Sequence, residues 1–553
     1  MRFLPSRRIL TAIASGLILS LAYPNWNVEL AVWLWLLPLL GVLWPSTHSS
    51  FVTRRSSFLP GYLAGLAFFV PNLWWLRHSS RVLGPAFAVD HSWAGWSQET
   101  MGFCAVVGLA GYCALYFGLW AWFAARVARP RVDSALESLR SALLCAAAWT
   151  ACEWLRGIVL SGFGWDGLGV ALHRNVALIQ IADVVGVCGA SFLPVFVSCV
   201  LFNATRRLIH NFRVGRRGSM RTELAVIAVA FLIVAGYGVF RLNEKPGDQI
   251  PLRTVLVQQN VPQAVKWSSD DVSGFYQQLA DLTRLNAEKR EGNPPVDLVI
   301  WPESAVPIEI FSHPDHPAYF NKILALGDFS LLTGAEVREP NKPMNTSAVL
   351  MRGNFESLRY YHKVHLVPFG EFLPFRDTFP FSLLKGVLPG DFVPGESTEP
   401  LRLEHPGVGI IPLICFEDTV GRLARKFVRD EPQLIVNLTN DGWFLQSAET
   451  EIHTANSIFR AIELRRPMAR ASNTGVTCII DDRGRIISKL KDPTTGDTFI
   501  EGVLLSDIKV PRNPPRTLYA RFGDWFSVLM LLICALATFL HKRRSPIPSD
   551  GPQ

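Results

Sequence analysis

Long apolar runs fill the N-terminal part of the chain and return near its C-terminus. A helix that crosses a bilayer needs about 20 mostly apolar residues. We therefore predict eight membrane spans, at residues 8–23, 29–45, 57–76, 101–125, 139–160, 185–205, 223–241 and 524–541. The first run follows three arginines and by itself also fits a signal peptide, but a second apolar run comes almost at once.

A different pattern occupies the chain from about Pro251 to Asp507. Short apolar strands alternate there with helical stretches, which is typical of an α/β domain. The predicted strands are TVLVQQN, VDLVIWPES, FSLLTGAE, TSAVLM, VGIIPLICFED, QLIVNLTND and VTCIID, and the predicted helices cover residues 268–288 and 453–464. We expect three parts: a membrane domain of seven helices over 1–245, an α/β domain over 250–510, and a C-terminal membrane helix with its tail over 520–553.

The distribution of charged residues along the chain indicates how it is oriented in the membrane. Only 18% of the 553 residues are charged, against about 25% in an average soluble domain. Basic residues gather in alternate gaps between the apolar runs, at residues 2–8, 54–55, 126–140, 206–221 and 542–544. Basic gaps face the cytoplasm, so both termini are predicted inside and the α/β domain outside. The net charge of +8 is thus a topology signal, and no nucleic-acid partner is expected.

Cysteine is the residue type that most clearly indicates a reactive group in this sequence. Of nine cysteines, only Cys415 and Cys478 lie outside the apolar runs and their flanks. No CxxC pair, zinc spacing, GxGxxG or Walker motif occurs, so neither a metal nor another cofactor is predicted. Cys478 sits inside the apolar stretch VTCII and is expected to be a core residue.

Three strand ends carry reactive side chains. Glu303 follows VDLVI, Lys363 and Glu371 lie in YYHKVHLVPFGE, and Cys415 ends the apolar strand GIIPLI. A cysteine nucleophile needs a proton acceptor and a donor for the developing oxyanion. A helix expected from Val420 would add positive potential at the thiol. Taken alone, each residue also fits a structural role: Glu303 as a loop-capping residue, Lys363 as a solvated surface residue and Cys415 as a buried core residue.

The order and context of these residues resemble a known superfamily. WPES, KxHLVPFGE and ICFE look like the Glu–Lys–Cys signatures of the nitrilase, or carbon–nitrogen hydrolase, superfamily. QQNVPQAVKW, LTNDGWF, RAIELRRPMARASNTG and the membrane-half motif EWLRGIVLSGFGW resemble, more narrowly, the apolipoprotein N-acyltransferase family. The resemblance implies an αββα sandwich inserted before the last of eight spans, with the catalytic domain in the periplasm of the bacterial inner membrane.

The resemblance also implies roles. Glu303 would be the general base, Lys363 the cation beside the oxyanion and Cys415 the nucleophile, with Glu371 supporting the site. Cys415 would take an acyl chain from a membrane phospholipid as a thioester. The α-amine of a diacylglyceryl-modified cysteine on an apolipoprotein would then accept that chain. We expect a single copy of the chain to suffice.

Four further positions are compared with the family pattern. Glu417 and Trp267 match positions that the family associates with activity. Phe416 stands where many members carry Tyr, and Gly164 where many carry Pro. His453 is expected to begin a helix and to pack or hydrogen-bond there.

Two other functions remain open at this stage. A membrane-anchored nitrilase-type amidase acting on a small amide would use the same three groups, although seven preceding spans exceed what an anchor needs. A transporter or scaffold with a degenerate domain would need intramembrane charges, and the sequence offers few.

Overall fold

The computed structural model describes residues 6–45, 57–79, 98–130, 134–263, 265, 272–292, 294–306, 308–338, 344–378 and 392–544. The chain forms two compact units. One comprises Met1–Trp74, Val106–Leu242 and Phe522–Gln553, and the other comprises Trp75–Ala105 and Asn243–Arg521. Each unit is described by itself below.

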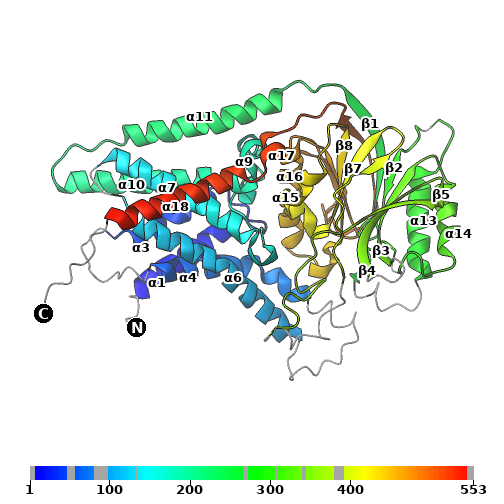
Figure 1. The fold of residues 1–553 in the computed structure, drawn as a ribbon, viewed down its shortest axis with the longest axis horizontal. Coiled ribbons are helices and arrows are strands. Elements are labelled where there is room, and N and C mark those ends of the chain that lie inside the picture. The colour runs from blue at the N-terminus through cyan, green and yellow to red at the C-terminus, as the bar shows by residue number, and fades with distance from the viewer. Residues whose placement is uncertain are drawn as a thin grey trace. The chain divides into compact units, whose positions relative to one another are not determined.

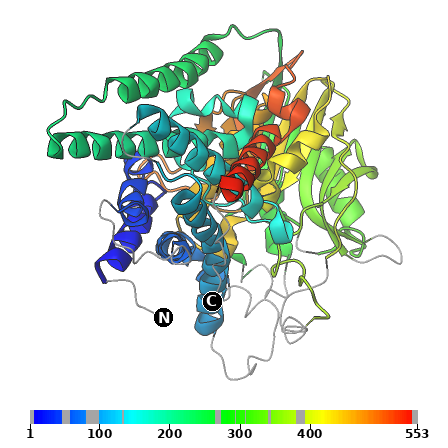
Figure 2. The same ribbon diagram turned by 60° about the vertical axis from the view of Figure 1, so that its left-hand side comes forward.

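The first unit is helical, and each of the eight predicted apolar runs contains a helix. Its helices are α1 (Ser6–Ser20), α2 (Ala31–Leu34), α3 (Leu36–Leu43), α4 (Phe58–Asn72), most of α6 (Gln98–Arg126), α7 (Ala135–Arg156), α8 (Val176–Ile179), α9 (Ala182–Ala190), α10 (Phe192–Arg213), α11 (Arg221–Asn243) and α18 (Trp525–Arg544). Among the described residues, four helices are long and apolar enough to cross a membrane: Glu99–Arg126, Phe192–Arg213, Arg221–Asn243 and Trp525–Arg543. α11 doubles back from the end of α10 (Figures 1 and 2), where Arg207 and Glu223 form an ion pair at 2.7 Å.

The second unit contains two six-stranded sheets, ordered β12-β1-β2-β3-β4-β5 and β11-β10-β9-β8-β7-β6. Their strands are β1 (Gln249–Gln258), β2 (Leu298–Ile300), β3 (Ser330–Arg338), β4 (Met344–Arg352), β5 (Asn354–His362), β6 (Leu401–Leu403), β7 (Val408–Ile414), β8 (Gln433–Thr439), β9 (Met468–Ser472), β10 (Cys478–Ile480), β11 (Ile486–Lys489) and β12 (Gly502–Pro511). The sheets contact each other, since Thr477 Oγ1 donates to Gln258 Oε1 at 2.6 Å and Asn260 N donates to the Asn473 carbonyl at 2.6 Å.

Helices cover the outer faces of the two sheets. α13 (Ser273–Ala287) and α14 (His316–Leu324) pack on the first sheet, where Leu279 and Phe320 join its buried core. α15 (Gly421–Ala424) and α16 (Glu449–Leu464) lie on the side of the second sheet (Figure 1). The unit is therefore an αββα sandwich.

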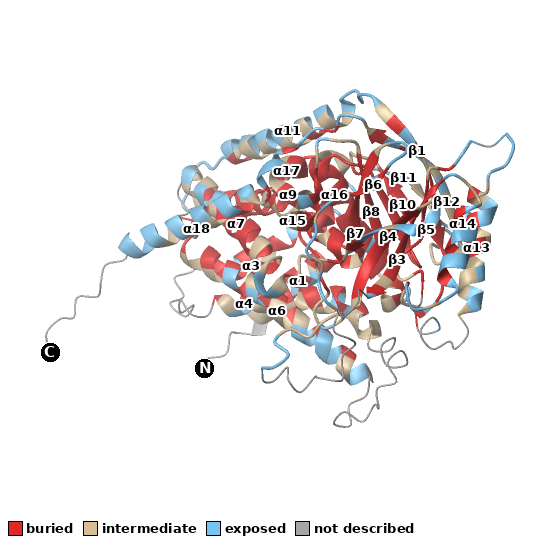
Figure 3. Cartoon of the chain, turned by 45° about the vertical axis from the view of Figure 1, so that its right-hand side comes forward, coloured by how far each residue is buried: buried red, intermediate tan, exposed pale blue. Residues whose placement is uncertain are grey.

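The central strands of the sandwich are buried along their whole length. Every residue of β7 and β8 is buried, and these two strands run parallel. Parallel strands covered on both faces read as continuous apolar runs, which is why both were predicted from the sequence. Figure 3 shows the central strands, such as β7 and β8, as buried and much of α13 and α14 as exposed.

Candidate active site

The turn after β2 fixes Glu303. Trp301 is fully buried, and its indole nitrogen donates to Thr283 Oγ1 of α13 at 3.0 Å. The next turn lies against β3 at Gly334, where a Cβ would come within 2.6 Å of the Glu303 Cα atom and the Pro302 carbonyl oxygen. The WPES motif therefore combines a core anchor with a turn that needs glycine on the neighbouring strand, and it leaves the Glu303 side chain almost fully buried.

Lys363 follows β5 directly and is held on both sides of its backbone. Its N–H donates to the Thr346 carbonyl at 2.8 Å, and its own carbonyl accepts from the Gly395 N–H at 2.8 Å. The side chain is fully buried, and Nζ donates to Glu371 Oε1 at 2.6 Å. The other Glu371 oxygen accepts from the Val367 N–H at 2.7 Å, so Glu371 fixes the lysine head.

Cys415 stands at the end of β7 with a φ of 51°. This left-handed conformation is uncommon for a residue with a side chain, and such strained positions cluster at functional sites. The helix expected from Val420 is present as α15, which begins at Gly421 with Val420 as its N-cap, but it is short. A 3₁₀ turn over Cys415–Thr419 comes first, Val420 has a non-helical ψ of 78°, and α15 has only four residues. A single helical turn supplies little dipole, so the positive charge near the thiol comes from side chains.

Charge couples the three residues across the two sheets. Lys363 Nζ lies 3.6 Å from Glu303 Oε1. Burial raises the pKa of Glu303 to about 7, while Lys363 and a hydrogen bond with Cys415 act in the opposite direction. Burial also raises the pKa of Cys415 to about 12, with Glu303 raising it further and Lys363 lowering it. Burial by itself would lower the pKa of Lys363, but Glu371 and Glu303 raise it above its usual value. At neutral pH the thiol therefore holds its proton, and the neighbouring Glu303 is partly ionised, so that it can accept this proton.

Glu417 joins the nucleophile turn to the lysine segment. Its fully buried carboxylate accepts four hydrogen bonds. Oε1 accepts from the Tyr361 hydroxyl at 2.8 Å and from the N–H groups of Val364 and His365 at 2.8 and 2.9 Å, and Oε2 accepts from the Ile414 N–H at 2.9 Å. Burial raises the pKa of Glu417 to about 7, against the effect of Lys363. One side chain thus fixes the spacing between Lys363 and Cys415.

The remaining predicted positions differ in how they relate to this cluster. The Phe416 ring is buried and stacks on the His365 imidazole at a centroid distance of 5.9 Å. Trp267 lies outside the described residues. Cys478 is fully buried in β10, and burial raises the pKa of its thiol to about 11, in agreement with its prediction as a core residue.

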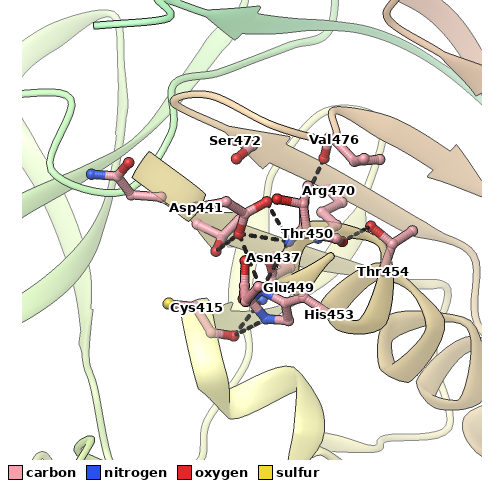
Figure 4. Close-up of polar contacts among 12 residues, drawn as sticks. Cys415, Asn437, Asp441, Glu449, Thr450, His453, Thr454, Arg470, Ser472 and Val476 are labelled. Carbon is pink, nitrogen blue, oxygen red and sulfur yellow. Dashed lines mark hydrogen bonds and ion pairs between the residues drawn. The ribbon is translucent and has the colours of Figure 1, made fainter. Parts of the chain in front are cut away.

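A buried charge cluster beside Cys415 was not predicted as a unit (Figure 4). His453 lies one turn inside α16, and its Nε2 is 3.0 Å from Asp418 Oδ1 while its Nδ1 is 3.1 Å from Asp441 Oδ1. Arg470 Nη2 donates to both Asp441 oxygens at 3.0 and 3.1 Å. Asp441, Glu449 and His453 are close enough to hold a metal ion, but the guanidinium of Arg470 already supplies a positive charge there. The signal was present in LTND and EIH, but nothing in the sequence brings these segments together.

Two protein-family models match the chain in succession. The model for the apolipoprotein N-acyltransferase N-terminal domain matches residues 15–200, and the carbon-nitrogen hydrolase model matches residues 256–512. Solved structures with a similar fold include an amidase from Nesterenkonia sp. (16% identity, TM-score 0.35, 50% of this chain and 94% of that one). Another is a carbon-nitrogen hydrolase from Helicobacter pylori, with 13% sequence identity and a TM-score of 0.35. The match covers 54% of this chain and 97% of that one. The two family models define the class: a carbon–nitrogen hydrolase domain preceded by an apolipoprotein N-acyltransferase N-terminal domain, in a chain with helices long and apolar enough to cross a membrane.

Full-length relatives narrow the class. The apolipoprotein N-acyltransferase of Geobacter metallireducens is 31% identical over 555 residues, which cover 98% of this chain and 97% of that protein. The enzyme of the same name from Rhodopseudomonas palustris is 32% identical over 97% of this chain and 96% of its own length. The chain belongs to the apolipoprotein N-acyltransferase family.

Proposed function

We propose that the protein completes lipoprotein maturation by acylating the N-terminal amine of apolipoproteins, with Cys415 as the acyl carrier. The observation that carries the proposal is the approach of Glu303 and Lys363 to Cys415 in a chain that aligns along 98% of its length with an acyltransferase. Glu371 and Glu417 are assigned positioning roles, because each holds the lysine segment by hydrogen bonds.

In the first step, the Cys415 sulfur attacks an ester carbonyl of a membrane phospholipid as Glu303 takes the thiol proton. Lys363 stabilises the oxyanion, the ester C–O bond breaks, and Glu303 returns the proton to the leaving alcohol. The products are a thioester on Cys415 and a lysophospholipid.

In the second step, the α-amine of a diacylglyceryl-cysteine attacks the thioester carbonyl. Glu303 accepts the amine proton, the C–S bond breaks, and the thiolate regains a proton. An amide forms, and the site returns to its starting state. Water must be kept from the thioester, because its hydrolysis would turn the enzyme into a lipase.

We propose eight membrane spans, one from each predicted apolar run. The segments between spans that are rich in Arg and Lys are placed on the cytoplasmic side. Residues 1–245 then form the membrane domain, residues 250–510 the periplasmic catalytic domain, and residues 520–553 the last span and a cytoplasmic tail. Phospholipid and lipidated acceptor both reside in the bacterial inner membrane, which fits this placement. A single chain supplies all three groups, so we expect a monomer to be active.

The test uses purified full-length protein and a phospholipid carrying a labelled acyl chain. Without acceptor, covalent label should accumulate, be released by neutral hydroxylamine, and be discharged by a lipopeptide with a free α-amine but not by its N-acetylated form. Cys415→Ala should abolish labelling, and the matched variant Cys478→Ala should retain it. Label that persists in Cys415→Ala, or turnover of small amides alone, would overturn the proposal and favour an amidase.

A further inference from the structure

The carbonyl oxygen of Cys415 is held by two side chains of the second sheet's layer. Asn437 Nδ2 of β8 donates to it at 3.0 Å, and His453 Nε2 of α16 lies 3.3 Å from it (Figure 4). Cys415 has the left-handed φ of 51°. Donors at the carbonyl fix the orientation of the peptide plane that follows, and this in turn fixes where the Cys415 side chain points.

His453 is itself held by charged groups from every segment packed around it. Asp418 follows the nucleophile in the 3₁₀ turn and also accepts a hydrogen bond from Ser457. Asp441 and Arg470 face Nδ1. Glu449 Oε1 is 3.4 Å from Nδ1, one helical turn before the histidine.

The charges of this cluster balance when the imidazole is protonated. Burial by itself would lower the pKa of His453, but Asp418 and hydrogen bonds to Asp418 and Asp441 raise it well above its usual value, against Arg470. Burial and Asp441 raise the pKa of Glu449 to about 7. Asp418, Asp441, His453 and Arg470 then contribute two negative and two positive charges, and Glu449, with a pKa of about 7, is partly protonated at neutral pH. A buried charge persists only when it is paired in this way.

We infer that His453 is a positioning residue of the acyl-transfer site, which holds the Cys415 turn by its carbonyl and supplies a second buried positive charge beside the nucleophile. The inference rests on the proposed role of Cys415. Lys363 follows a strand of the first sheet and His453 lies in α16, so two separate elements place a cation where it acts on the thiol. Both residues act to lower the pKa of the thiol.

The test measures the thiolate of Cys415 directly. Purified full-length protein is treated with hydroxylamine to remove any thioester. Alkylation of Cys415 by iodoacetamide is then followed by peptide mass spectrometry as a function of pH. Only the thiolate reacts, so loss of the imidazolium in His453→Gln should slow alkylation about tenfold below the thiol pKa, the effect of a shift of about one pKa unit.

The matched control is His316→Gln. His316 is equally buried and bonded to Tyr276 Oη and the Ile310 carbonyl at 2.7 and 2.8 Å, but it packs on the first sheet at α14. Alkylation of Cys415 at the wild-type rate in His453→Gln, or an equal slowing in His316→Gln, would overturn the inference.

A second variant separates charge from packing. Asp418→Asn removes the carboxylate that contributes most to keeping His453 protonated. The alkylation rate of this variant relative to wild type should fall as pH rises, because the imidazole then loses its proton. A ratio independent of pH would reduce the cluster to a structural role. Alkylation needs no acyl transfer, so these results stand apart from the labelling experiment: failure of acyl labelling in the wild type would overturn the proposed function instead.

Discussion

Replacing Lys363 by Met tests how the buried lysine controls the proposed base. Lys363 Nζ lies 3.6 Å from Glu303 Oε1, and both side chains are buried. At an effective dielectric constant of about 20, two unit charges at this distance interact by about 4–5 kcal/mol, or roughly three pKa units. Relaxation will reduce this, so we expect the pKa of Glu303, about 7 in the native protein, to rise by roughly one to three units in Lys363→Met.

The sign of the effect follows from the role of the base. A positive charge favours the ionised carboxylate, so its loss favours the protonated form, which cannot accept the thiol proton. The rate of Cys415 acylation should therefore rise with pH through about 7 in the native enzyme. In Lys363→Met the same rise should come at higher pH. The plateau should also be about 10²–10³-fold lower, since one oxyanion-stabilising group is gone.

The assay is single-turnover labelling of Cys415 with an acyl-labelled phospholipid between pH 5 and pH 10. The control variant is Lys489→Met, which removes a surface pair with Glu451 at 2.7 Å. Exposed pairs contribute about 0–1 kcal/mol, so its profile should match the native one. If the acylation rate of Lys363→Met rises over the same pH range as that of the native protein, and only its plateau is lower, the electrostatic coupling is refuted.

Lys363→Arg should reduce acyl transfer to a lipopeptide at least about a hundredfold, because a planar guanidinium does not place its charge where the compact ammonium does; near-native activity would make Lys363 a generic charge. Glu417→Gln should lower the free energy of unfolding by about 1–3 kcal/mol, because the amide nitrogen of Gln would face the Ile414 N–H. An unchanged melting temperature would contradict this. With an impermeant thiol reagent on intact cells, Lys491→Cys should be labelled and Arg217→Cys protected. The reverse pattern would invert the proposed topology.

The strand ends that carry Glu303 and Cys415 were predictable because β2 and β7 are short, fully buried and rich in Val, Leu and Ile. Only the end of β5, at YYH, was predicted, since NFESLRYYH mixes charged and apolar residues on a largely exposed strand. Its pairing with β4 decides its conformation more than its own pattern does.

The site contains features that no sequence pattern expresses. The side chain of Glu417 turns back to the Ile414 N–H and across to the His365 N–H, within a 3₁₀ turn that precedes the short helix α15. The partners of His453 lie up to 38 residues away from it along the chain. Single residues with reactive groups can be recognised from the sequence, whereas the contacts that hold them require the folded sandwich.

The pairing of β1 with β12 places the two ends of the catalytic domain side by side, with Gln249 opposite Pro511. During synthesis, β12 leaves the ribosome after Glu303, Lys363 and Cys415. This strand completes the first sheet. A chain that stops short of β12 holds every candidate catalytic group but leaves the buried edge residues of β1 without their antiparallel partner. We therefore expect a translation product that ends before β12 to lack acyl-transfer activity, although it contains the cysteine.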